Sequence, residues 1–142
     1  MPRNRIPMPS DEYYLERDDY LMTVHFCLAY TNNKRKLQTL GGVRAQVLDG
    51  MPHGTDISNP TQREALIRAW LQGKVDLVEK SVAEATNGIP VLYQPLLMAV
   101  TERKMIIDQI MARYRVPMGK KQFLRMRRRV YYLVHRGIDA VR

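Results

Sequence analysis

The stretch NPTQREALIRAWLQGKVDLVEKSVAEATNG, residues 59–88, holds the strongest secondary-structure signal in the chain. Asn59 suits the N-cap of a helix, and Pro60 suits its first position. The apolar residues that follow recur at helical spacing and share one face: Leu66, Ile67, Trp70, Leu71, Val75, Val78 and Val82. The pattern predicts a long helix that buries this face and stops near Asn87-Gly88, a pair typical of left-handed helix ends.

The segments before this helix carry weaker signals. Prolines at positions 2, 7 and 9 predict a flexible arm over residues 1–9. A helix is predicted from Ser10 or Asp11, because apolar residues then recur at helical spacing. It is expected to weaken at residues 31–33, and Gly41-Gly42 should stop a short helical piece after it. Residues 50–59 show no periodicity and predict a loop.

The segments after residue 88 predict two shorter helices and a turn. Pro90 and Pro95 break the chain into short pieces, and Thr101 suits the cap of a helix from Glu102 to about Arg113. The residues expected to face inward from that helix are Met105, Ile106, Ile110 and Met111. Residues 116–119 interrupt the pattern, and a last helix is predicted from about Lys120 to Arg136, ending at Gly137.

No stretch alternates with period two, so the predicted fold is all-α: a small helical domain of about five helices with a C-terminal helix-turn-helix. We divide it into a flexible arm (1–9), a helical N-terminal and oligomerisation region (10–94) and a helix-turn-helix DNA-binding region (95–142).

The charge of the chain is concentrated at its C-terminal end. The 142 residues carry a net charge of +9, yet residues 1–102 sum to −1. Residues 103–142 contain 12 Lys and Arg but only Asp108 and Asp139, a sum of +10. Such a field needs a polyanion, an anionic membrane surface or an acidic protein, and nucleic acid is the commonest of these. The apolar runs are too short for a membrane helix, which needs about twenty residues.

The last predicted helix separates its apolar and basic residues. On a helical wheel one side holds Phe123, Met126, Val130, Leu133 and Val134. The opposite side holds Lys121, Arg125, Arg128, Arg129, Tyr132 and Arg136. A solvated surface would explain a basic face in many proteins. Four arginines in the five positions 125–129, with no acidic residue on the predicted helix, favour a ligand that neutralises them.

If this helix enters the major groove of double-stranded DNA, its N-terminal residues meet the base edges. The candidate base readers are Lys120, Lys121, Gln122 and Arg125, with Gln122 suited to adenine and Arg125 to guanine. Arg127, Arg128 and Arg129 lie further along and suit phosphate contacts. Near the turn, Arg113 and Arg115 are placed to hold the DNA backbone.

Two segments resemble a known family. GMPHGTDISNPTQREAL (50–66) and PLLMAVTERKMIIDQIMARYRVPMGKKQFLRMRRRVYYLV (95–134) resemble the late-gene transcriptional regulators of phages and prophages of Gram-positive bacteria, the ArpU, RinA and LtrC type. Their C-terminal half is similar to region 4 of sigma factors. The resemblance implies that residues 120–134 enter DNA upstream of late operons, with Phe123 and residues 127–129 at the family's aromatic and arginine positions. Gly119 departs from the family, which usually has Ser or Thr there.

The remaining chemistry-bearing residues form no catalytic or metal constellation in the sequence. Cys27 is the single cysteine, so no internal disulfide and no cysteine-based zinc site is expected. The three histidines share no i,i+3 or i,i+4 relation. We therefore expect no enzyme activity, no metal and no cofactor. The acidic cluster Glu16, Asp18 and Asp19 suits a helix start; its other interpretation is an acidic patch that binds a basic partner or screens the arginine helix.

The predicted function is sequence-specific regulation of phage or prophage late genes in the cytoplasm of a bacterial host. A homodimer through residues 10–87 is expected, because a lone helix reads too few base pairs. RNA polymerase or another protein is a further possible partner, given the apolar helix at residues 102–113. Two rivals remain: an inhibitor of an acidic host protein or of a ribonucleoprotein such as a CRISPR effector, and a packaging protein resembling a small terminase subunit.

Overall fold

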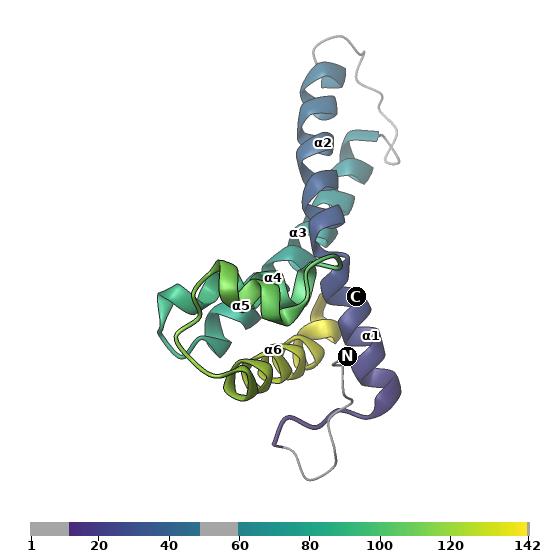
Figure 1. Cartoon of the computed structure of the whole chain (residues 1–142). Helices are drawn as coiled ribbons and strands as arrows, with labels where there is room; N and C mark the ends of the chain where they lie inside the picture. The colour runs from purple at the N-terminus through teal and green to yellow at the C-terminus, as the bar shows by residue number, and fades with distance from the viewer. Residues whose placement is uncertain (1–11, 49–59, 142) are drawn as a thin grey trace.

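A computed structural model describes residues 12–48 and 60–141, in which helices are joined by turns and short irregular segments, with no strand (Figure 1). The helices are α1 (Arg17–Leu28), α2 (Tyr30–Leu48), α3 (Pro60–Ala85), α4 (Tyr93–Thr101), α5 (Ile107–Arg113) and α6 (Lys120–Val141), with a 3-10 helix at Pro90–Leu92. The all-α prediction is confirmed. The predicted arm at residues 1–9 and loop at residues 50–59 lie outside the described residues.

Helix α6 is the centre of the arrangement. It packs along α3 and also contacts α1, α4 and α5. Helix α2 and the first part of α3 lie side by side and project away from the helices packed around α6, as Figure 1 shows. Within the described ranges, no helix combines the length and the apolar character that a membrane crossing requires.

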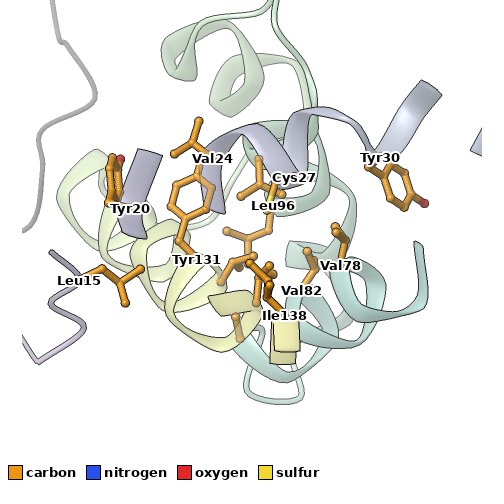
Figure 2. Close-up of a cluster of buried hydrophobic side chains, with 14 of the residues drawn as sticks. Leu15, Tyr20, Val24, Cys27, Tyr30, Val78, Val82, Leu96, Tyr131 and Ile138 are labelled. Atoms are coloured by element: carbon orange, nitrogen blue, oxygen red, sulfur yellow. The ribbon is translucent and has the colours of Figure 1, made fainter. Parts of the chain in front are cut away.

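The core is formed where α1, α3, α4 and α6 meet (Figure 2). Tyr20 of α1 and Tyr131 of α6 meet edge to face, with ring centroids 5.5 Å apart. Val82, Leu96 and Val134 are completely buried between the helices. Burial of each such side chain stabilises the fold by roughly 1.5–3 kcal/mol, so the apolar side of α6 holds the helix in place.

The N-terminal helix is shorter than its sequence pattern predicts. The expectation of a helix from Ser10 or Asp11 is wrong for the described residues 12–16, because α1 begins at Arg17 after an extended Glu16 (φ −61°, ψ 155°). Leu15 is buried in the core from this extended segment. A helix through the segment would point that side chain elsewhere, so burial of an apolar residue overrides the local helical signal.

The boundary between α1 and α2 also differs from the prediction. The break lies at Ala29, one turn before the predicted weak point at residues 31–33. Helix α2 then continues through Gly41-Gly42 to Leu48, so the predicted stop is wrong. Two glycines cost a helix about 2 kcal/mol relative to alanine, and packing along α3 offsets such a cost.

Helix α3 begins at Pro60 and ends at Ala85, and the predicted stop is confirmed by positive φ at Asn87 (53°) and Gly88 (79°). Its apolar face is only half buried. The residues from Leu71 onward enter the core as expected, whereas Leu66 (67% exposed), Ile67 and Trp70 (47% exposed) do not. These three precede the part of α3 that packs in the core, so their predicted burial is wrong.

Two helix boundaries near the C-terminus are corrected. Thr101 ends α4, since its hydroxyl donates to the Leu97 carbonyl oxygen (2.6 Å), and α5 begins only at Ile107, which leaves Ile106 exposed. Helix α6 does not end at Gly137 but continues to Val141. A Cβ atom at position 137 would collide with the side chain of Leu77 in α3, so Gly137 permits close packing instead of ending the helix.

Candidate nucleic-acid interface

The connection between α5 and α6 is a defined turn. The Arg115 N–H donates to the Ala112 carbonyl (3.4 Å) and the Val116 N–H to the Met111 carbonyl (3.1 Å). These bonds make a Schellman motif, whose left-handed position usually holds glycine. Arg115 occupies that position with φ 49°. The turn therefore projects an exposed arginine at a position where only a few per cent of non-glycine residues are found.

An ion pair joins the first turn of α6 to the first turn of α5. The Lys120 ammonium lies 3.0 Å from the Asp108 carboxylate, and the Phe123 N–H donates to the Gly119 carbonyl (3.1 Å). Lys121 and Gln122 are exposed at the same end of α6. Of the predicted base readers, Lys121, Gln122 and Arg125 are exposed, whereas Lys120 is half-buried beside a carboxylate.

The extended segment before α1 lies against the basic side of α6. The Glu12 carboxylate accepts a hydrogen bond from Arg125 (2.5 Å), and the guanidinium of Arg125 lies 5.6 Å from the ring centre of Tyr13. The Tyr13 ring in turn lies 5.7 Å from that of Tyr132, which is itself 5.7 Å from the guanidinium of Arg136. Three predicted site residues therefore share one aromatic and cationic cluster: Arg125, Tyr132 and Arg136.

Sequence reasoning missed Glu12 and Tyr13 as part of this surface. It had assigned possible screening of the arginine helix to Glu16, Asp18 and Asp19. In the structure Asp19 does approach α6, with its carboxylate 3.7 Å from the His135 imidazole. Glu12 is separated from Arg125 by 113 positions, so no local pattern predicts the pair.

The three consecutive arginines face different surroundings. Arg127 is half-buried, with its guanidinium 6.0 Å from the Tyr131 ring centre; among the described residues, its Nε has no hydrogen-bond partner. Burial raises the pKa of Tyr20, and the positive charges of Arg127 and Arg128 partly oppose this shift. Arg129 donates to the side-chain oxygen of Asn87 at the end of α3. Arg127 and Arg128 therefore lie nearer α1, and Arg129 nearer α3.

The remaining predicted contact, Arg113, is exposed at the end of α5. Its guanidinium lies 5.7 Å from the Tyr114 ring centre and 3.9 Å from the Met105 sulfur. Together with Arg115 it places two cations beside the turn that leads into α6. The structure thus brings Arg113, Arg115, Lys121 and Gln122 to the turn end of the α5–α6 pair and Arg125, Tyr132 and Arg136 to one side of α6, whereas Arg127 lies against Tyr131.

The structure also shows where the cysteine and the side chains that could bind a metal lie. Cys27 is completely buried, and burial raises the pKa of its thiol, so it remains a neutral packing group. In the described parts of the chain, no group of three or more His, Cys, Asp or Glu side chains is arranged to hold a metal ion.

Comparisons with known proteins return no relative. The chain matches no protein-family model, no curated protein and no solved structure. The similarity to late-gene regulators therefore rests on the segments 50–66 and 95–134 quoted above.

Proposed function

We propose that this chain is a sequence-specific DNA-binding regulator of phage or prophage late genes, acting in the bacterial cytoplasm. Helices α5 and α6 act as a helix-turn-helix in which α6 enters the major groove. The observation that carries the proposal is the two-sidedness of α6: Phe123, Val130 and Val134 are completely buried, while Lys121, Gln122 and Arg125 are exposed. A major groove admits one helix presented in this way.

The electrostatics support a polyanionic partner. Residues 103–142 carry a net charge of +10, and the Asp108 and Glu12 carboxylates, which pair with Lys120 and Arg125 of α6, are exposed. The pairs Lys120–Asp108 and Arg125–Glu12 have side chains that are 39–61% exposed. Exposed pairs contribute at most about 1 kcal/mol, so DNA phosphates compete with them easily. Arg129 bonds a neutral amide and keeps its full charge.

We assign base reading to Lys121 and Gln122, with Lys120 and Arg125 available once DNA displaces their carboxylates. Phosphate contacts are assigned to Arg128 and Arg129 and, at the turn, to Arg113 and Arg115. Arg127, Tyr132 and Arg136 complete the positively charged surface along α6. Phosphate contacts supply affinity, and the few residues at the start of α6 supply specificity.

A homodimer is part of the proposal, because operators with two half-sites are read by symmetric pairs of recognition helices. The projecting part of α3 presents Leu66, Ile67 and Trp70 to solvent. Exposed apolar side chains clustered on one helix are typical of an interface. We therefore assign the dimer interface to α2 and the first part of α3, where Trp70 also lines a cavity with Phe26 of α1 and Ile138 of α6.

An inhibitor of an acidic host protein is the second candidate. The observation that favours it is that side chains on α6 already pair with carboxylates of the same chain: Arg125 with Glu12, Lys120 with Asp108 and His135 with Asp19. An acidic protein surface would present the same groups.

The deciding experiment is binding of the full chain to a pool of random duplexes at two salt concentrations, followed by sequencing of the retained DNA. An enriched motif with salt-sensitive affinity supports the regulator, and the symmetry of the motif reports the dimer. Retention without a motif indicates a packaging or general nucleic-acid role. No retention at low salt rejects DNA as the partner and leaves the acidic protein.

A further inference from the structure

A small cavity opens where the segment before α1, the end of α3 and the basic side of α6 meet. It has a volume of about 90 Å³ and is lined by Tyr13, Ala85, Asn87, Arg125, Met126 and Arg129. The cavity is open to solvent and has room for a small anion.

Two arginines line this cavity. Arg125 and Arg129 lie one turn apart on α6, where side chains four residues apart are neighbours. Two like charges at this spacing repel each other, and an anion between them removes the repulsion. The planar fork of donors on each guanidinium matches the oxygens of a phosphate.

Asn87 lines the cavity on the side opposite α6 and contacts Arg129. Its left-handed backbone (φ 53°) turns the chain at the end of α3, and its side-chain oxygen accepts a hydrogen bond from Arg129. An asparagine amide that accepts through its oxygen still has two N–H donors. The wall therefore orients Arg129 and offers further donors to an oxyanion.

The Glu12 carboxylate forms an ion pair with the other arginine, Arg125. Its oxygen lies 2.5 Å from Arg125, and the two side chains are 60% and 59% exposed. A carboxylate oxygen is the nearest intramolecular equivalent of a phosphate oxygen. Because the pair is exposed, its attraction is weak and it exchanges readily with a free anion.

We propose that this cavity is a phosphate site, in which Arg125 and Arg129 hold one phosphate of the DNA backbone and the Glu12 carboxylate gives way to it. The identity of the phosphate as DNA rests on the proposed function; the site itself does not. This assignment moves Arg125 from base reading to backbone binding and leaves the base edges to Lys121 and Gln122.

The site is tested first with inorganic phosphate on the full chain. The side-chain Nε–H signals of the arginines are followed by NMR during a phosphate titration, against chloride at equal ionic strength. We expect saturable, phosphate-specific shifts at Arg125 and Arg129. Arg129→Ala should weaken binding about three- to tenfold, the loss of one charge-assisted contact. Arg103→Ala, which removes an exposed charge between α4 and α5, should leave it unchanged.

The substitution Glu12→Gln tests whether the Glu12 carboxylate competes with phosphate for Arg125. It should tighten phosphate binding about two- to fivefold, since the competing charge is lost, and have no such effect in an Arg125→Ala background. Equal shifts in phosphate and chloride, or an effect of Glu12→Gln that survives removal of Arg125, would overturn the phosphate site.

A duplex carrying neutral methylphosphonate linkages, placed one at a time, identifies the source of the phosphate. One linkage should weaken binding of the unmodified chain but not of Arg129→Ala. Phosphate binding without any duplex binding would support the site and reject the proposed function. Duplex binding without phosphate-specific shifts would reject the site and leave the function in place.

Discussion

The side chain of Leu77 in α3 fills the space beside Gly137 of α6, where a Cβ atom would otherwise stand. The contact belongs to the packing of α3 along α6, which holds α6 in place. Because α6 carries the proposed recognition surface, its position depends on a glycine that the sequence alone presents as a helix stop.

Gly137→Ala is therefore expected to destabilise the fold. Insertion of a methyl group into a packed contact costs about 1–3 kcal/mol, which exceeds the gain of about 1 kcal/mol in helix propensity. Urea unfolding followed by circular dichroism measures the change in the free energy of unfolding. Gly73→Ala is the matched control, since a methyl group there meets only the side chain of Val141, near the chain end; it should be neutral or stabilising. Equal effects of the two substitutions would contradict the packing role.

Arg115→Gly should separate stability from binding. Glycine adopts the left-handed backbone at position 115 without strain, so the free energy of unfolding should rise by about 1 kcal/mol. The same change removes a proposed backbone contact and should weaken binding to every duplex alike. A loss of stability on thermal unfolding would show that the arginine side chain has a structural role.

The proposed phosphate contacts predict a change in salt dependence. Arg128→Ala and Arg129→Ala should each weaken binding to all sequences and lower the slope of log affinity against log salt by about one. Gln122→Ala should instead relax the preferred sequence and keep the slope. Fluorescence anisotropy on specific and random duplexes over a range of salt measures both quantities. Identical behaviour of all three variants on every duplex would reject the division into base and phosphate contacts.

Alkaline pH should destabilise the core through its tyrosines. Burial raises the pKa of Tyr131 and of Tyr20. In the unfolded chain a tyrosine ionises near pH 10, whereas the folded state keeps these hydroxyls protonated. Their contribution is therefore fully present below about pH 10 and is lost as pH rises further toward the folded-state pKa. Urea midpoints from pH 8 to 11 should fall above about pH 10, and less steeply in Tyr131→Phe.

The projecting part of α3 predicts the site of self-association. Leu66→Asp should weaken the proposed dimer, because the exposed apolar surface around Trp70 would lose its affinity for a second copy. Sedimentation equilibrium measures the dissociation constant. Ala65→Asp, which introduces the same charge at an exposed position on another side of the same helix, serves as the control. A chain that is monomeric at all concentrations would remove the dimer from the proposal.

The helical elements were predictable wherever the signal is local. Pro60 begins α3 and Asn87-Gly88 ends it as capping chemistry predicts. The buried positions of α6 include Phe123 and Val130, as the wheel predicts. Such signals act within one or two helical turns, so a single sequence contains them.

The candidate site was predictable only in part. The arginines were found because their number and spacing are visible in the sequence. Their partners were not: Glu12 and Tyr13 reach Arg125 from the other end of the chain, and Asn87 reaches Arg129 from the end of α3. Contacts between residues so far apart depend on how the helices pack.

The sequence by itself determined the helical class, the limits of α3 and the concentration of positive charge in the last forty residues, because capping, periodicity and charge are local properties. The tertiary structure decided which glycines interrupt a helix and which arginines are already neutralised. Helix α2 runs through Gly41-Gly42 and packs along α3, and Gly137 lies inside α6 with Leu77 of α3 beside it. Leu15 is buried in the core from the segment before α1, whose last residue, Glu16, is extended. Packing energy between helices exceeds the local preferences it overrides, and only the assembled fold shows where it acts.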